Sequence, residues 1–112
     1  MCVFCQIRDG QLPARIVHRD EQCFVLEDLH PQAPTHLLVI PAEHIPTVND
    51  LTEAHRSLVG HLYLTAAQVA RQRGIAESGY RLVMNTRADA GQTVFHIHLH
   101  VLGGRPLGWP PG

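Results

Sequence analysis

Three histidines stand at every second position near the end of the chain, in His96-Ile97-His98-Leu99-His100-Val101-Leu102. Side chains of a strand alternate between its two faces, so a strand over 96–102 places all three imidazoles on one face and the aliphatic residues between them on the other, toward the core. Imidazole is well suited to proton transfer, nucleophilic attack and metal binding near neutral pH. An exposed, purely structural strand face would be formed equally well by Thr, Lys or Glu, so it does not explain three imidazoles in a row. The spacing therefore predicts a functional site on this strand, either a metal centre or a catalytic row.

A zinc centre built from all three histidines of a straight strand would be strained, although adjacent members of the row could chelate one ion. The rise per residue separates the Cα atoms of His96 and His100 by about 13 Å, whereas zinc requires each ligating nitrogen within about 2.1 Å. A neutral imidazole is a good nucleophile, and its neighbours can hydrogen-bond an anion such as a phosphate group. Metal-dependent hydrolysis is the alternative from chemistry alone, and it predicts a loss of activity with chelator.

A glycine-containing turn, Ala90-Gly91-Gln92-Thr93, lies just before the histidine row. Gly91 permits close approach of a ligand to the backbone. Backbone N–H groups of such a turn, together with the Thr93 hydroxyl, can receive phosphate oxygens. The turn therefore favours a phosphate-bearing substrate.

The elements that would position this row belong to an α+β protein with an antiparallel sheet. A continuous apolar run over 36–40, closed by Pro41, predicts a strand. Further expected elements are a short helix over 3–8, a hairpin of strands 15–18 and 23–26, and a strand over 80–85. A long helix, capped by Asp50 or Thr52 and ended by Gly74, is predicted by an apolar stripe at helical spacing. This stripe consists of Ala54, Leu58, Leu62, Ala66, Val69 and Ala70.

Length and composition narrow the class of protein. The 112 residues predict a single domain over 1–112, with a Gly- and Pro-rich tail over 103–112. Nine Lys and Arg against ten Asp and Glu leave no basic excess to hold a nucleic-acid backbone. No apolar run approaches the length of a membrane span, and the start of the chain lacks the features of a signal peptide. We therefore expect a cytoplasmic protein with neither a nucleic acid nor a membrane as partner.

The sequence resembles the histidine triad (HIT) family, and within it the Hint-like branch. The resemblance is carried by the triad over 96–102, the region 29–41, the segment 91–95, and the ends 102–105 and 109–112. It implies a HIT-like α+β fold with about five antiparallel strands, one long helix and a short N-terminal helix, assembled as a homodimer. It also implies a nucleotide-binding hydrolase that cleaves the P–N bond of adenosine phosphoramidates and releases AMP and an amine. The alternatives are a dinucleoside polyphosphate hydrolase, as in another branch, and a nucleotide-binding regulator whose catalysis is incidental.

The resemblance assigns roles to individual residues. His98 would be the nucleophile on the α-phosphorus, His100 would hydrogen-bond the phosphate, and His36 would orient the cluster or relay protons. His96, the first of the row, is a further catalytic candidate unless it binds a metal. The other substrate-binding positions implied are Asp28 at the ribose, Leu29 against the base, Asn85, Gly91, Gln92 and Thr93 at the phosphate, and Trp109 on the amine side. Thr93 stands where the branch often has Ser, and Ala90 where it often has Gly.

A structural zinc is implied by the same resemblance. Cys2-x-x-Cys5 is a two-ligand motif, and the matching positions of some HIT proteins add His44 and His96. Such a closed tetrahedral set leaves no open position for water, so the metal would be structural and catalysis would need no cofactor. The alternative is two ordinary free thiols near the N-terminus.

Overall fold

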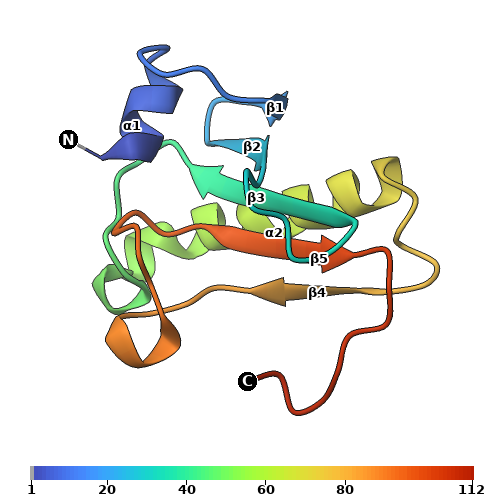
Figure 1. Ribbon diagram of the computed structural model, residues 1–112. Coiled ribbons are helices and arrows are strands. Elements are labelled where there is room, and N and C mark those ends of the chain that lie inside the picture. Colours follow the sequence, from blue (N-terminus) through green and yellow to red (C-terminus); the bar gives the residue numbers. More distant parts are fainter. Residues whose placement is uncertain (1) are drawn as a thin grey trace.

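A computed structural model describes residues 2–112 and contains a five-stranded antiparallel sheet (Figure 1). The strands follow the order β1-β2-β3-β5-β4, so β1 and β4 are the edges. They span Ile16–Arg19 (β1), Cys23–Glu27 (β2), Thr35–Pro41 (β3), Tyr80–Val83 (β4) and Leu99–Gly103 (β5). The helices are α1 (Val3–Arg8) and α2 (Arg56–Gln72), with short 3-10 turns η1 (Val48–Asp50), η2 (Glu53–His55) and η3 (Ala88–Ala90). The predicted α+β fold, with one long and one short N-terminal helix, is confirmed.

Helix α2 covers one face of the sheet, behind it in Figure 1. Leu62, Ala66, Val69 and Ala70 of the predicted stripe are buried, together with Thr65, which was not predicted. Of the other two stripe residues, Leu58 is half-buried, and Ala54 lies in η2 and is exposed. The buried stripe residues pack against the odd-numbered residues of the central strands in one apolar core. This core fixes the sheet on which the histidine row stands.

Helix α1 lies on the opposite face and covers only part of it (Figure 1). Phe4 and Ile7 pack there against even-numbered residues of the sheet, including Phe24 and Leu38. The register pairs Leu38 with His100, so His100 projects from the same face. The even-numbered residues of 36–40 and 98–100 therefore form the floor of a site that α1 borders.

The strand predicted over 96–102 is shorter than expected, and this prediction is corrected at its first three residues. Strand β5 begins at Leu99, and the register that pairs Val39 with Leu99 brings Ile97 opposite Pro41. Proline has no N–H, so the ladder cannot continue normally, and the N–H of Ile97 donates instead to the carbonyl of Ile45 at 2.8 Å. The predicted alternation is nevertheless kept, because Ile97, Leu99 and Val101 are all buried.

The start of the long helix also differs from the prediction. Thr47 caps η1 in a capping box with Asp50, and Thr52 caps η2 with His55 as its partner, so neither Asp50 nor Thr52 caps α2 itself. The α-helix begins only at Arg56. Gly74, with φ of 74°, follows the helix end as predicted. Gly103, expected in the tail, ends β5.

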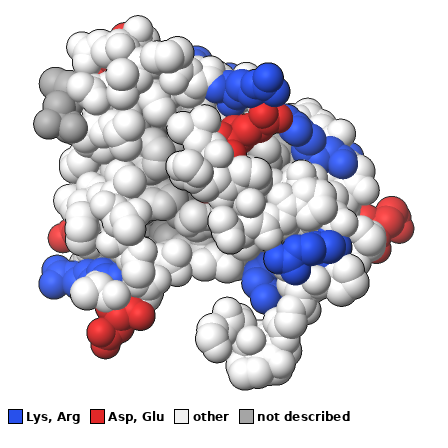
Figure 2. Space-filling view, in the orientation of Figure 1, with Lys and Arg blue, Asp and Glu red and all other residues white. Residues whose placement is uncertain are grey.

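The molecular surface is mostly uncharged on the face shown in Figure 2, where blue and red side chains are interspersed. Within residues 2–112, no helix is long and apolar enough to cross a membrane.

Candidate active site

Among residues 2–112, one ring nitrogen of His98 has a hydrogen-bond partner and the other has none. Its Nδ1 lies 2.8 Å from the carbonyl oxygen of His96. A carbonyl only accepts hydrogen bonds, so Nδ1 carries the proton and donates it. The neutral ring then keeps its lone pair on Nε2. The half-buried His98 therefore presents an unprotonated nitrogen suited to nucleophilic attack.

His36 and His100 form a second, directional pair on β3 and β5. The N–H of Gln32 donates to Nδ1 of His36 at 3.0 Å, so Nε2 of His36 carries the proton in the neutral ring. This Nε2 lies 2.9 Å from Nδ1 of His100, so the neutral His100 ring carries its own proton on Nε2. The pair therefore ends in an N–H donor on His100, and the His98 and His100 ring centroids are 5.0 Å apart.

Burial favours the neutral form of the His36 and His100 rings. It lowers the pKa of His36, and burial together with His98 and His36 lowers the pKa of His100 to about 4. Asp28 lies 3.4 Å from Nε2 of His36 and partly opposes the shift. Near pH 7 His100 is therefore a neutral donor whose proton position is set by its neighbours.

A pocket of about 220 Å³ lies between α1 and the end of β2, and it is connected to the histidine row through Phe4, which packs against His98, and Leu38, which pairs with His100. Its largely apolar wall includes Val3, Phe4 and Ile7 of α1, and its rim includes Asp28 and Leu29. Leu29 is 89% exposed, so its side chain is available to a ligand. Phe4 was not singled out from the sequence, although its ring packs edge-on against His98 at 5.1 Å between centroids.

The turn before the histidine row is braced by Gln92. The side-chain oxygen of Gln92 accepts from the N–H of Arg87, and its amide nitrogen donates to the carbonyls of Pro46 and Val94. Its backbone N–H is also used, at 3.1 Å from the carbonyl of Arg87. Gln92 therefore shapes the turn, while Gly91 and Thr93 on either side are exposed.

Asn85 and Trp109 line a different cavity, of about 560 Å³, between β4, the η3 turn and the C-terminal residues. Trp109 is 80% exposed. The described residues of one chain thus bring His36, His98, His100 and Asp28 together, and leave Asn85 and Trp109 at a neighbouring hollow.

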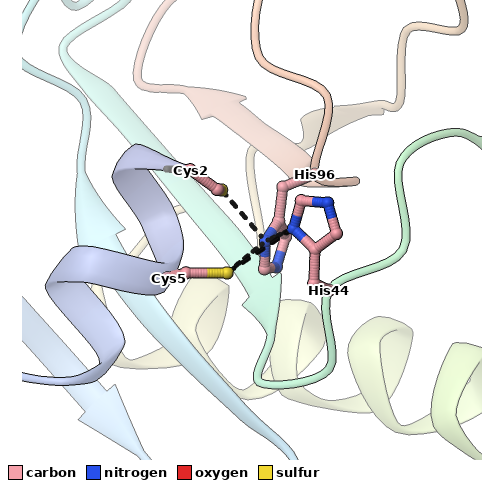
Figure 3. A group of neighbouring side chains, drawn as sticks. All are labelled: Cys2, Cys5, His44 and His96. Atoms are coloured by element: carbon pink, nitrogen blue, oxygen red, sulfur yellow. Dashed lines mark hydrogen bonds between the residues drawn. The ribbon is translucent and has the colours of Figure 1, made fainter.

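Cys2, Cys5, His44 and His96 converge at the start of α1 (Figure 3). Nδ1 of His96 lies 3.4 Å from Sγ of Cys2, 3.6 Å from Sγ of Cys5 and 3.2 Å from Nδ1 of His44. Sγ of Cys5 is 3.5 Å from Nδ1 of His44. Nε2 of the fully buried His96 donates to the carbonyl of Pro41 at 2.8 Å, so its Nδ1 lone pair faces the cluster.

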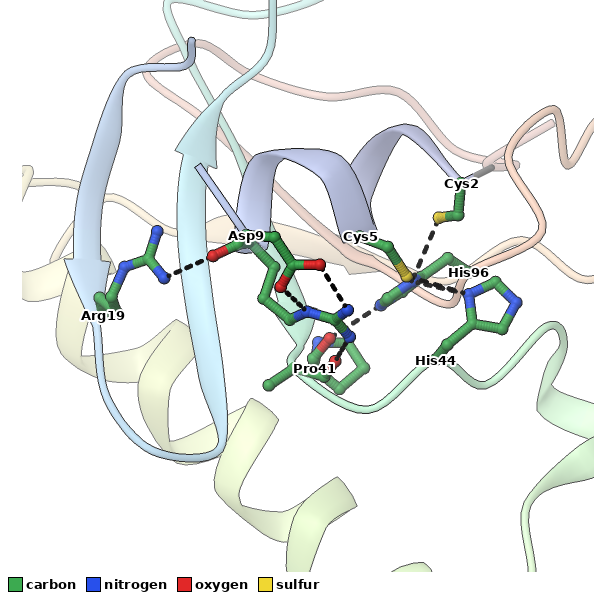
Figure 4. A network of polar contacts seen from close by, with 9 residues as sticks. Cys2, Cys5, Asp9, Arg19, Pro41, His44 and His96 are labelled. Atoms are coloured by element: carbon green, nitrogen blue, oxygen red, sulfur yellow. Dashed lines mark hydrogen bonds and ion pairs between the residues drawn. The ribbon is translucent and has the colours of Figure 1, made fainter. Parts of the chain in front are cut away.

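This cluster fits a tetrahedral zinc ion. Zinc bonds of about 2.3 Å to sulfur and 2.0–2.1 Å to nitrogen separate tetrahedral ligands by about 3.6 Å for a sulfur–nitrogen pair and about 3.3 Å for two nitrogens. The four distances above follow these separations. Helix α1 is fixed beside the cluster by Arg8, which donates to Asp9 and to the carbonyl of Ala42, and by Arg19, which donates to the carbonyl of Arg8. Figure 4 shows Arg19 and Asp9 beside the cluster.

Another polar cluster, which was not predicted, joins the β1–β2 hairpin to α2. Oδ2 of Asp20 lies 2.7 Å from Nε2 of His18 and 2.9 Å from Nε2 of His61. Burial alone would raise the pKa of Asp20, but hydrogen bonds from His18, His61 and two backbone N–H groups lower it below its usual range. Cys23, completely buried beside it, has its pKa raised by burial to about 11. The contacts are mutually satisfied, which points to a structural role.

Comparisons with known proteins agree with this geometry. The family profile described as "Scavenger mRNA decapping enzyme C-term binding" matches residues 1–106. The purine nucleoside phosphoramidase of Escherichia coli is 50% identical over 106 residues, covering 95% of this chain and 89% of the relative. A HIT-like protein of Synechocystis is 47% identical, covering 98% and 96%. The crystal structure of a HIT family hydrolase from Legionella pneumophila has a TM-score of 0.98 and 46% identity, covering both chains completely. The chain therefore belongs to the histidine triad family.

Proposed function

We propose that this protein is a purine nucleoside phosphoramidase, a hydrolase that cleaves the P–N bond of adenosine and related 5'-phosphoramidates. The observation that carries the proposal is the pairing of a free Nε2 lone pair on His98 with an N–H donor on neighbouring His100. The 50% identity to the phosphoramidase of Escherichia coli supports the same reaction.

The reaction proceeds through two displacements at phosphorus. Nε2 of His98 attacks the α-phosphorus and forms an N–P bond while the P–N bond of the substrate breaks. The leaving nitrogen takes up a proton and departs as an amine, because an amide anion is a poor leaving group. Water then attacks the nucleotidyl-histidine, which releases AMP and restores the ring. Splitting one difficult step into two easier ones is the advantage of the protein nucleophile.

The neighbouring groups bind and orient the nucleotide. His100 donates its Nε2–H to a phosphate oxygen, and His36 holds the tautomer that makes this donation available. Asp28 and Leu29, at the rim of the apolar pocket, receive the ribose and the base of an AMP-type ligand. Gly91 and Thr93 would contact phosphate oxygens from the turn that Gln92 shapes, and Asn85 would do so only from the neighbouring hollow that it lines with Trp109.

Cys2, Cys5, His44 and His96 would hold a structural zinc, and the donor set and its spacing support this assignment. Zinc, when bound, supplies a rigid cross-link and no chemistry for the reaction, because four protein ligands close its coordination shell. The residues then pin α1, and with it Phe4, against His98.

We further propose that the protein is one HIT domain over residues 1–112 that acts as a homodimer in the cytoplasm. The edge strand β4 has one unpaired side, to which a second copy can add. The exposed Trp109 would then reach toward the partner subunit and the amine side of its substrate.

Turnover of adenosine phosphoramidates and diadenosine polyphosphates, measured side by side, tests the reaction. We expect hydrolysis of the phosphoramidates and a covalent adduct of one nucleoside monophosphate, detected by mass spectrometry after rapid acid-free quenching. His98→Ala should abolish turnover and the adduct while AMP still binds. Preferred turnover of the polyphosphates would favour the alternative hydrolase, and unchanged turnover by His98→Ala would refute the nucleophile.

A further inference from the structure

The polarity of the His36–His100 pair depends on the N–H of Gln32, while the Asp28 carboxylate, 3.4 Å from Nε2 of His36, favours the same tautomer. The N–H of Gln32 donates to Nδ1 of His36 at 3.0 Å, and this forces the proton of the neutral ring onto Nε2. Without that N–H, the other tautomer becomes accessible: Nδ1 of His36 would carry the proton and Nε2 would accept from Nδ1 of His100. His100 would then turn a lone pair, instead of an N–H, toward the phosphate.

Gln32 lies outside the helices and strands, in the segment between β2 and β3. Its side-chain amide nitrogen donates only within this segment, to the carbonyl of His30. The segment is tied to the rest of the fold by Arg105, whose Nη2 donates to the carbonyl of Gln32 at 2.8 Å. Arg105 also donates from Nη1 to the carbonyl of Pro106 at 3.0 Å, which orients its guanidinium.

Close packing brings the same two segments together independently of that hydrogen bond. A Cβ added to Gly104 would lie 2.8 Å from Cβ of Pro34, and Gly104 has φ of 95°. The backbone that leaves β5 therefore lies directly against the segment that contains Gln32. This contact places Arg105 where its side chain reaches the carbonyl of Gln32.

We propose that Arg105 is a positioning residue for the histidine row, because it holds Gln32 so that its N–H fixes the tautomers of His36 and His100. Only the expected effect of Arg105 on turnover rests on the proposed function, whereas its effect on the tautomers does not. The chain of contacts runs from Arg105 to Gln32, His36 and His100, with distances of 2.8, 3.0 and 2.9 Å. Arg105 therefore acts through other residues and need not touch the substrate.

Nitrogen-15 NMR of the histidine rings, which reports the protonated nitrogen of each neutral ring, tests the proposal without turnover. Signals of His36 and His100 are assigned with His36→Gln and His100→Gln. In Arg105→Ala we expect the His36 signals to move toward a mixture of two tautomers. We also expect kcat to fall by about three- to tenfold, which corresponds to the free energy of one hydrogen bond, while KM stays unchanged. Arg105→Lys, which keeps a donor, should restore part of both.

Arg56→Ala is the control, because Arg56 is also an exposed arginine with a hydrogen-bond partner, Glu53, but it lies at the start of α2, on the face of the sheet opposite to His100. It should leave the His36 and His100 signals and kcat as in the wild type. Thermal unfolding of each variant confirms that it folds. Unchanged His36 signals in folded Arg105→Ala would overturn the proposal, whatever happens to kcat. If the wild type hydrolyses no phosphoramidate, the proposed function fails, and the NMR comparison still decides the role of Arg105.

Discussion

Replacing His100 by Gln should make the stability of the protein less dependent on pH. Burial, with His98 and His36 nearby, holds the pKa of His100 at about 4 in the folded protein, whereas a histidine in an unfolded chain titrates near 6.5. Between these two pH values the unfolded chain binds a proton that the folded protein does not. The contribution of His100 to the free energy of unfolding is therefore fully present above pH ~6.5 and is lost as the pH falls toward ~4. The full shift corresponds to about 3 kcal/mol, of which about 2 kcal/mol is lost between pH 7 and pH 5.

Urea unfolding of the wild type and His100→Gln at pH 7 and at pH 5 measures this effect. The free energy of unfolding of the wild type should fall by about 2 kcal/mol more between the two pH values than that of His100→Gln. His30→Gln, which removes an exposed ring, corrects for the loss of one histidine. An equal pH dependence in wild type and His100→Gln would refute the reasoning, because it would mean that His100 titrates alike in the folded and unfolded chains.

Three further predictions concern packing, backbone strain and the metal cluster. Leu62→Ala removes a completely buried side chain from the core under the sheet and should lower the free energy of unfolding by about 2–5 kcal/mol; a loss below about 1 kcal/mol in urea would contradict the packing. Gly104→Ala should cost about 1–3 kcal/mol, because alanine is strained at a φ of 95° and its Cβ would clash with Pro34; an unchanged melting temperature would contradict this. Removing metal with a strong chelator should lower the melting temperature and weaken AMP binding, measured by calorimetry, because α1 lines the pocket. Cys5→Ser, which removes one proposed ligand, should show the same loss without chelator. An equal AMP affinity before and after chelation would mean that the Cys/His cluster does not influence nucleotide binding.

Repetition along the chain made the main elements predictable from the sequence. The helical stripe ending at Val69 and Ala70 and the alternation of Ile97, Leu99 and Val101 both identify the faces that are buried. The point where β5 begins was not predicted, because it depends on Pro41 standing opposite Ile97, which only the register of the folded sheet defines.

The candidate site likewise has one part that was predictable from the sequence and one part that was not. The imidazoles were identified by residue type and spacing. Their partners are largely backbone groups, such as the N–H of Gln32 and the carbonyls of Pro41 and His96, and every residue carries such groups. Phe4 likewise reads as an ordinary apolar residue of a short helix, and only the packing of α1 brings its ring against His98. Tertiary contacts of this kind leave no signal in a single sequence.

The three triad histidines are chemically different although their residue type and spacing are the same. His96 donates from Nε2 to Pro41 and turns its Nδ1 lone pair to the cysteines. His98 donates from Nδ1 to the carbonyl of His96, which leaves its lone pair on Nε2. His100 accepts at Nδ1 from His36 and so carries its proton on Nε2.

These arrangements suit the roles proposed above for the three residues, which are a metal ligand, a nucleophile and a hydrogen-bond donor. Because a neutral imidazole has one proton for two nitrogens, fixing one nitrogen by a neighbour decides what the other can do. The role proposed for each histidine therefore depends on the group to which its other ring nitrogen is hydrogen-bonded. Exchanging one of those partners should change the role of a histidine even where the histidine itself is retained.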